Sequence, residues 1–148
     1  MRLRRKPDET IPETRLWVYR DVEFDSEGFQ SSNAESTKVL WENIVRVALC
    51  YEMHPIALAD WDYWAFQTHD STLLVWVEVN DATQAKRFSA EVEKRFGRPD
   101  IPPMKDWLDH DQDIRTYVIW PEADIGKSLY ALKTRHRWSF KGRLVYAQ

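Results

Sequence analysis

A chain of 148 residues with a formal net charge of −3 is long enough to fold as one domain with a sizeable core. Its four glycines are too few for phosphate-cradling loops or long flexible linkers, and its single cysteine, Cys50, excludes an intrachain disulfide framework and favours a reducing compartment. The basic N-terminus lacks the apolar core of a signal peptide and no apolar run approaches the roughly 20 residues of a membrane span, so we expect a cytoplasmic protein without membrane insertion.

The charge is distributed unevenly along the chain. The first six residues carry +4 and the last 22 carry +6, which leaves −13 for the residues between them. Either the basic ends lie on an acidic body, or the protein presents two surfaces to different partners. We treat residues 1–12 as a flexible basic tail.

Alternating apolar residues predict strands in the first third of the chain. In Leu16–Phe24 the apolar side chains recur at every second position, which indicates one strand interrupted by a single arginine. Ser26–Thr37 is polar and is expected to be a loop. Val39–Trp41 is short and rich in residues that favour strands. Ile44–Met53 alternates cleanly and ends before Pro55.

A hairpin is predicted next. Tyr63–Thr68 and Leu73–Val79 are joined by four polar residues, and both segments are rich in aromatic and β-branched side chains. In the second segment large apolar residues occupy both faces, which indicates a sheet that is contacted on both sides.

The strongest single prediction is a helix over Asp81–Phe96. Asp81 can cap its first turn, and Gln84 three residues later completes a pattern like a capping box. Gly97 suits the left-handed position after a helix, and Pro99 prevents continuation. The expected core-facing stripe consists of Ala85, Phe88, Val92 and Phe96.

The last third of the chain is expected to extend this core. Residues 98–113 form a proline-rich acidic loop around Trp107, and Ile114–Trp120 is a strand. Asp124–Lys133 is a candidate short helix, and the basic aromatic segment Trp138–Tyr146 is a candidate last strand. The whole chain is therefore predicted to be one α+β domain: a bent antiparallel sheet of about six strands, packed by one main helix, with 114–148 as a C-terminal extension on the core.

No catalytic constellation or metal site is evident, and no cofactor is expected. The four histidines have no metal-like spacing, and mid-strand Cys50 is more typical of a small core residue than of a nucleophile. Asp109, Asp111 and Asp113 alternate as calcium loops begin, but Ile114 and Trp120 occupy the positions where that template needs glycine and glutamate. The acidic run is therefore expected to be a solvated turn.

The leading functional hypothesis is a small non-catalytic interaction module. An aromatic and acidic surface would bind a basic protein partner, to neutralise or scaffold it, with its carboxylates steering the encounter. The alternative for Trp61 and Trp64 is that they point into the core at the start of a strand. The candidate contact residues are Trp61, Asp62, Tyr63, Trp64, Asp106, Trp107, Asp109 and Asp111.

Two other functions stay open. The basic aromatic C-terminus could bind nucleic acid by neutralising phosphates and stacking bases, through Arg135, Arg137, Trp138 and Lys141, although the acidic body opposes this. The chain could also be an enzyme or a small-ligand binder whose pocket is assembled from residues distant in sequence. An apolar pocket with converging polar groups would be the structural sign of that function.

The order of elements over Leu16–Phe96 resembles bacterial pleckstrin-homology-like and GRAM-like domains. The resemblance is carried by Val39–Val47, by the hairpin ending Val75–Val79 and by the helix with Phe88 and Phe96. It implies a strongly bent antiparallel sheet closed by a helix and used for binding more often than for catalysis. The lipid-binding members use a basic pocket between early strands, whereas this region is acidic, so no phosphoinositide site is expected.

Overall fold

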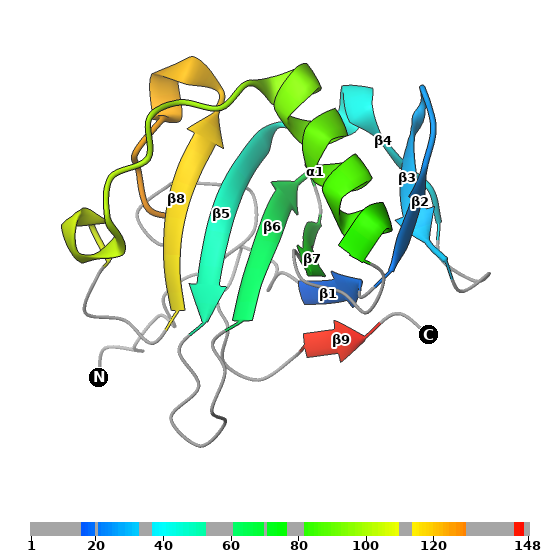
Figure 1. Ribbon diagram of the computed structural model, residues 1–148, viewed down its shortest axis with the longest axis horizontal. Helices are drawn as coiled ribbons and strands as arrows, with labels where there is room; N and C mark the ends of the chain where they lie inside the picture. Colours follow the sequence, from blue (N-terminus) through cyan, green and yellow to red (C-terminus); the bar gives the residue numbers. More distant parts are fainter. Residues whose placement is uncertain are drawn as a thin grey trace, which may run out of the picture.

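A computed structural model describes residues 16–19, 21–32, 37–52, 61–69, 71–76, 82–109, 114–129 and 144–146. The fold is α+β: two sheets contain seven antiparallel strands, four in the larger sheet and three in the smaller one, beside one main helix, and the described strands do not close into a barrel. Figure 1 shows the smaller sheet beside the helix, at the right of the view. Within the described residues no helix has the length and apolarity needed to cross a membrane.

The larger sheet has an antiparallel part and a parallel edge. Its four antiparallel strands, in spatial order, are β8 (Ile114–Trp120), β5 (Arg46–Glu52), β6 (Trp61–Gln67) and β7 (Thr72–Trp76). Strand β1 (Leu16–Tyr19) lies parallel to β7, and β9 (Leu144–Tyr146) lies parallel to β1. The predicted β6–β7 hairpin is confirmed, whereas the parallel pairs differ from the wholly antiparallel sheet expected from the sequence.

The smaller sheet corrects two expectations. It consists of β2 (Val22–Phe24), β3 (Gly28–Ser31) and β4 (Val39–Leu40). The single strand predicted over Leu16–Phe24 is therefore two strands in different sheets, and the predicted loop Ser26–Thr37 contains β3. The reason lies in Phe29, which is fully buried in the aromatic core and so fixes this polar stretch against β2.

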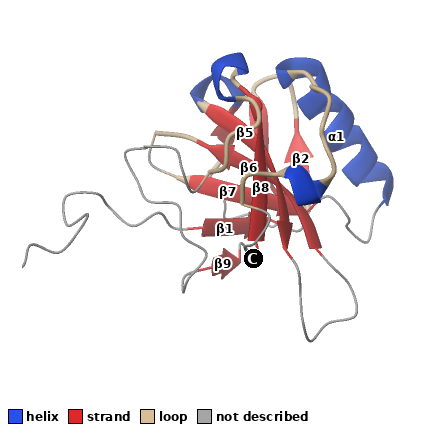
Figure 2. Cartoon of the chain, turned by 90° about the vertical axis from the view of Figure 1, so that its left-hand side faces the viewer, coloured by secondary structure: helices blue, strands red, loops and turns tan. Residues whose placement is uncertain are grey.

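Helix α1 (Ala82–Phe96) confirms the strongest prediction and covers one face of the sheet (Figure 2). Phe88 and Val92 of its stripe are buried. Gly97 has φ 82° and its N–H donates to Glu93 O over 2.8 Å, as expected for a residue that ends a helix. Asp81 lies outside the described residues. The amide of Gln84 donates to Val22 O over 2.7 Å, which ties the start of the helix to β2.

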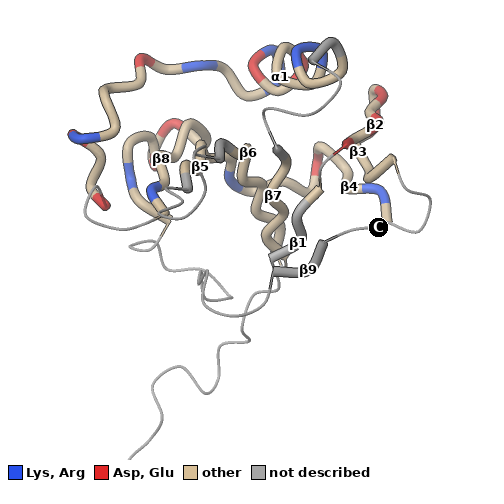
Figure 3. Tube along the Cα trace, turned by 60° about the horizontal axis from the view of Figure 1, so that its bottom comes forward, with Lys and Arg blue, Asp and Glu red and all other residues tan. Residues whose placement is uncertain are grey.

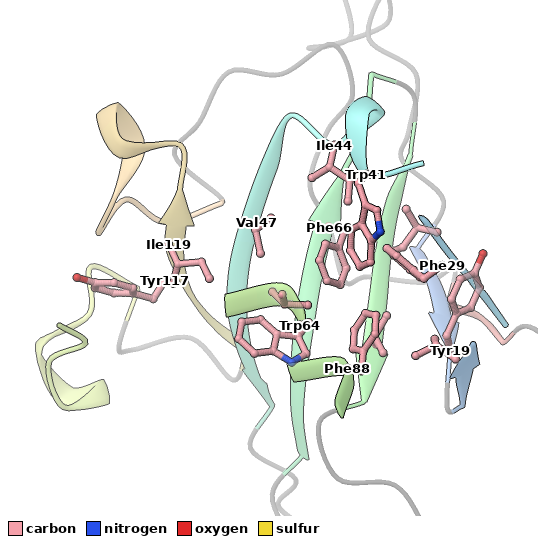
Figure 4. Packing of buried hydrophobic residues seen from close by; sticks show 14 of the residues in the cluster. Tyr19, Phe29, Trp41, Ile44, Val47, Trp64, Phe66, Phe88, Tyr117 and Ile119 are labelled. Atoms are coloured by element: carbon pink, nitrogen blue, oxygen red, sulfur yellow. The ribbon is translucent and has the colours of Figure 1, made fainter. Parts of the chain in front are cut away.

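Buried side chains lie on both faces of the larger sheet, as predicted. In β5, Val47, Leu49 and Tyr51 belong to the cluster under α1, whereas Ala48 and Cys50 belong to a second cluster on the opposite face. The α1 side is dominated by aromatic rings. Figure 4 shows several of them between the strands and the helix, including Trp41, Trp64, Phe66 and Phe88.

The segment from Gly97 to Asp109 connects α1 to β8 and contains a short 3₁₀ helix, η2 (Met104–Asp106). It runs from the end of α1 past β8 (Figure 1). We call residues 97–109 the strap. Two contacts with Tyr117 hold it against β8: Tyr117 Oη donates to Asp100 O over 3.5 Å, and the Trp107 ring lies 5.4 Å from the Tyr117 ring.

The helix predicted at Asp124–Lys133 is wrong for its described part. A 3₁₀ helix, η3 (Glu122–Asp124), is followed by a turn, because Gly126 takes φ 86° and its N–H returns to Val118 O over 2.9 Å. The N–H of Val118 in turn donates to Lys127 O over 3.1 Å. This turn therefore provides hydrogen-bond partners for the N–H and C=O of Val118 at the free edge of β8.

Candidate functional site

A cavity of about 340 Å³ lies between the α1 side of the larger sheet and the strap. Strands β5, β6 and β8 form one wall, and α1 and the strap form the others. We call it the Trp64–Trp107 cavity. Most of its lining is apolar or aromatic: Leu49, Tyr51, Tyr63, Trp64, Ile101, Met104, Trp107 and Ile119. Cys50, Ser89, Glu93 and Arg98 complete it.

Hydrogen bonds hold both indole rings of the cavity wall. Trp64 is 5% exposed, and its Nε1 donates to the hydroxyl oxygen of Ser89 on α1 over 3.1 Å. Trp107 is equally buried, and its Nε1 donates to Pro102 O over 2.9 Å within the strap. Because each ring is fixed by a polar contact as well as by packing, the cavity has well-defined walls.

The charged groups of the lining lie at its solvent side. Glu93 follows Ser89 by one helical turn, so both side chains lie on the same side of α1. Arg98 donates from Nη1 to Glu93 Oε1 over 2.7 Å. The side chain of Arg98 is 63% exposed and that of Glu93 is 34% exposed. The cavity is therefore apolar inside and has an ion pair at its rim.

Asp109 does not belong to an exposed acidic surface, contrary to expectation. It is buried, and its Oδ2 accepts hydrogen bonds from the backbone N–H of Thr116, from Thr116 Oγ1 and from Ser128 Oγ, each over 2.9 Å. Thr116 Oγ1 also accepts a hydrogen bond from Leu129 N over 2.8 Å. The carboxylate thus joins the end of the strap to β8 and to the turn after it.

Burial also alters the interpretation of the other predicted contact residues. Tyr63, Trp64 and Trp107 are all buried, so they do not form an exposed surface for a protein partner. The structure instead brings them together around one cavity. Asp106 is exposed, as a contact residue requires.

The remaining predicted site residues are not placed. Trp61 and Asp62 lie in β6, but their side chains are outside the described part of the structure. Asp111 and the four residues of the nucleic-acid alternative, Arg135, Arg137, Trp138 and Lys141, also lie outside the described residues.

Sequence reasoning missed the other half of the cavity wall. Leu49 follows the alternation of β5 and was expected in the core, but Ile101 and Met104 lie in a segment predicted only as a loop. The signal present was the combination of three prolines and Trp107 after the helix, which is typical of an ordered segment that packs on a core.

A second, more open hollow of about 590 Å³ lies between the end of α1 and the smaller sheet. Its main feature is Arg95, whose guanidinium lies 4.8 Å from the centre of the Trp41 ring. Arg95 also donates to Glu91 Oε1 over 2.7 Å and to Ser26 O over 3.2 Å. These contacts give Arg95 a structural role, joining α1 to the smaller sheet.

In the described part of the chain, no group of three or more His, Cys, Asp or Glu side chains could hold a metal ion. No protein-family model, curated protein or solved structure matches the chain.

Proposed function

We propose that this protein binds a small, largely apolar molecule in the Trp64–Trp107 cavity. The observation that carries the proposal is the cavity itself, which has eight apolar or aromatic side chains in its wall and a few polar groups toward solvent. Ligand pockets typically measure roughly 300–1,000 Å³ and have this composition. A volume of about 340 Å³ suits a small ligand.

Several features support binding rather than catalysis. Among the described residues that line the cavity there is no histidine. The hydroxyl oxygen of Ser89 accepts the Trp64 indole N–H, and Glu93 is paired with Arg98, so neither is arranged as a nucleophile beside a general base. The resemblance to pleckstrin-homology-like domains, which are mostly binding modules, agrees with this function and stays a prediction.

A matched pair of substitutions tests the proposal. Leu49→Phe enlarges a side chain in the cavity wall, whereas Leu108→Phe makes the same change at a residue that is 69% exposed and outside the lining. We expect 1-octanol, a small neutral probe with an apolar chain, to bind the wild-type chain and the Leu108→Phe variant with equal affinity in isothermal titration calorimetry. The Leu49→Phe variant should bind it at least about tenfold more weakly because the ring occupies the space.

Equal binding of 1-octanol by the Leu49→Phe and Leu108→Phe variants would contradict the proposal, as would no binding by the wild-type chain. Thermal unfolding of each variant checks that the fold is kept. A ligand that binds only the folded state also raises the unfolding temperature, so the same scan with 1-octanol present gives a second reading.

Binding of a basic protein partner is the second candidate. Its supporting observation is a row of exposed acidic residues along β2 and the turn after it: Asp21, Glu23, Asp25 and Glu27. Figure 3 shows acidic residues on these elements. Lys38 offsets part of this charge, since it pairs with Asp25 and Glu27. A partner recovered from nuclease-treated lysate should bind the wild-type chain more weakly at high salt, and should bind the double variant Asp21→Asn/Glu23→Gln more weakly than the wild-type chain. Unchanged affinity in both comparisons would exclude steering by this row.

A further inference from the structure

Two polar side chains of the Trp64–Trp107 cavity, Ser89 and Arg98, have hydrogen-bond donors that remain open to a ligand. The indole N–H groups of Trp64 and Trp107 already donate, to Ser89 Oγ and to Pro102 O. The Ser89 oxygen accepts the first of these bonds, and among the described residues no acceptor is present for its own O–H. A ligand that reaches α1 would therefore meet a hydroxyl donor beside an aromatic wall.

Arg98 adds the strongest donor group of the lining. A guanidinium has five N–H donors, and the described residues give Arg98 one partner, Glu93, through Nη1. The planar fork of an arginine matches the two oxygens of a carboxylate. Because the Arg98 side chain is 63% exposed and also lines the cavity, its other N–H groups can reach an anion at the rim.

From this arrangement we infer that the cavity takes an amphipathic monocarboxylic acid, with its apolar chain or ring inside and its carboxylate on Arg98. The inference rests on the proposed function and assigns the chemical class of its ligand. The apolar part would contact Trp64, Trp107 and Met104, and the carboxylate would lie near the end of α1. An acceptor atom on the apolar part of the ligand would lie beside α1, where the Ser89 hydroxyl can donate to it.

Glu93 gives the inference a consequence that a simple apolar pocket does not have. Its carboxylate occupies one edge of the Arg98 guanidinium, over 2.7 Å, and repels a second carboxylate at the same rim. Removing the charge of Glu93 should therefore strengthen the binding of an anionic ligand. Removing the charge of Arg98 should weaken it. A purely structural ion pair would not give opposite effects, since either change breaks the same contact.

The test compares two probes of equal chain length, octanoate and 1-octanol, by isothermal titration calorimetry with the full chain at neutral pH. We expect the wild-type chain to bind octanoate about fivefold more tightly than 1-octanol, a modest factor because the arginine is partly solvated. Arg98→Gln should remove this preference, because it lowers the affinity for octanoate more than the affinity for 1-octanol. Glu93→Gln should bind octanoate more tightly than the wild-type chain does.

Lys94→Gln is the matched control, because Lys94 is an exposed cation of α1 outside the cavity lining. It should leave both affinities unchanged. The inference is overturned if octanoate and 1-octanol bind the wild-type chain equally, or if Arg98→Gln and Glu93→Gln shift the octanoate affinity in the same direction. If 1-octanol binds under either of these outcomes, the proposed function survives; if neither probe binds, the proposed function fails and the inference fails with it.

Discussion

Trp64 donates a hydrogen bond from its indole Nε1 to Ser89 Oγ over 3.1 Å, which connects β6 to α1 across the wall of the cavity. This contact explains how a large ring can lie beside an open space without filling it. The polar edge of the indole is held on the helix, while its apolar surface lines the cavity. A residue that the sequence suggested as an exposed contact thereby becomes part of a ligand pocket.

Ser89→Ala should lower the free energy of unfolding by about 1 kcal/mol, because it removes the acceptor of a buried indole N–H. Urea unfolding monitored by circular dichroism measures this change. Lys86→Ala, at an exposed position of the same helix, is the control and should change the free energy by less than about 0.5 kcal/mol. Equal stability of the Ser89→Ala variant and the wild-type chain would mean that the hydrogen bond does not hold the ring.

Asp109→Ala should destabilise the fold by roughly 3 kcal/mol, since it leaves the N–H and hydroxyl of Thr116 and the hydroxyl of Ser128 without the carboxylate that accepts from them. Urea unfolding is again the measurement. The exposed Asp106 provides the matched control, and Asp106→Ala should have almost no effect. Similar costs for the two substitutions would contradict the role assigned to Asp109.

Acid should weaken the contact between η3 and β5. A hydrogen bond from Lys127 and the nearby charge of Arg46 hold the pKa of the Asp124 carboxyl below its ordinary value of 3.8, against an opposing effect of burial. Because the folded pKa lies below the unfolded one, the contribution of this carboxylate to stability is complete above about pH 3.8 and is lost as the pH falls through the folded value.

The stability difference between the wild-type chain and an Asp124→Asn variant should therefore be constant near neutral pH and shrink below about pH 3.8. Urea unfolding at a series of pH values measures it. Glu122→Gln, an exposed change in the same 3₁₀ helix, is the control. A difference that grows on acidification would have the wrong sign for a carboxyl with a lowered pKa.

Gly28→Ala should disrupt the smaller sheet. A Cβ atom at this position would lie 2.0 Å from the backbone carbonyl oxygen of Val39. Rotating a side chain cannot relieve this overlap, because the oxygen belongs to the backbone. We expect a loss of more than about 2 kcal/mol in the free energy of unfolding. Gly97→Ala is the comparison, because a Cβ there meets nothing within 4 Å and only the φ of 82° opposes it, which should cost about 1 kcal/mol. A smaller cost at Gly28 than at Gly97 would show that β3 and β4 separate easily.

The elements with strong local patterns were predictable from the sequence. The end of α1 follows from Gly97 and Pro99, and the alternation of Val47, Leu49 and Tyr51 correctly placed one face of β5 in the core. These predictions held because backbone conformation and one buried face decide them locally. The pairing of β1 with β7 was not predictable in this way, since it joins segments distant along the chain.

The smaller sheet and the cavity depend on such distant contacts. Strand β3 is short and has polar neighbours, so only its packing of Phe29 against Phe66 and Phe88 reveals it. Trp64 and Trp107 were recognised as candidate site residues, but the direction in which each ring points is set by partners elsewhere, Ser89 and Pro102. No local pattern encodes those partners.

The most direct measurement is a ¹H–¹⁵N spectrum of the indole N–H groups during titration with 1-octanol. The resonances are assigned with single Trp→Phe variants. The indole N–H groups of Trp64 and Trp107 belong to the cavity wall, whereas that of Trp41 donates to Asp25 O elsewhere in the core and is an internal control. We predict saturable shifts of the Trp64 and Trp107 resonances with little change at Trp41. No shift of Trp64 and Trp107, or an equal shift of all three, would contradict binding in the cavity.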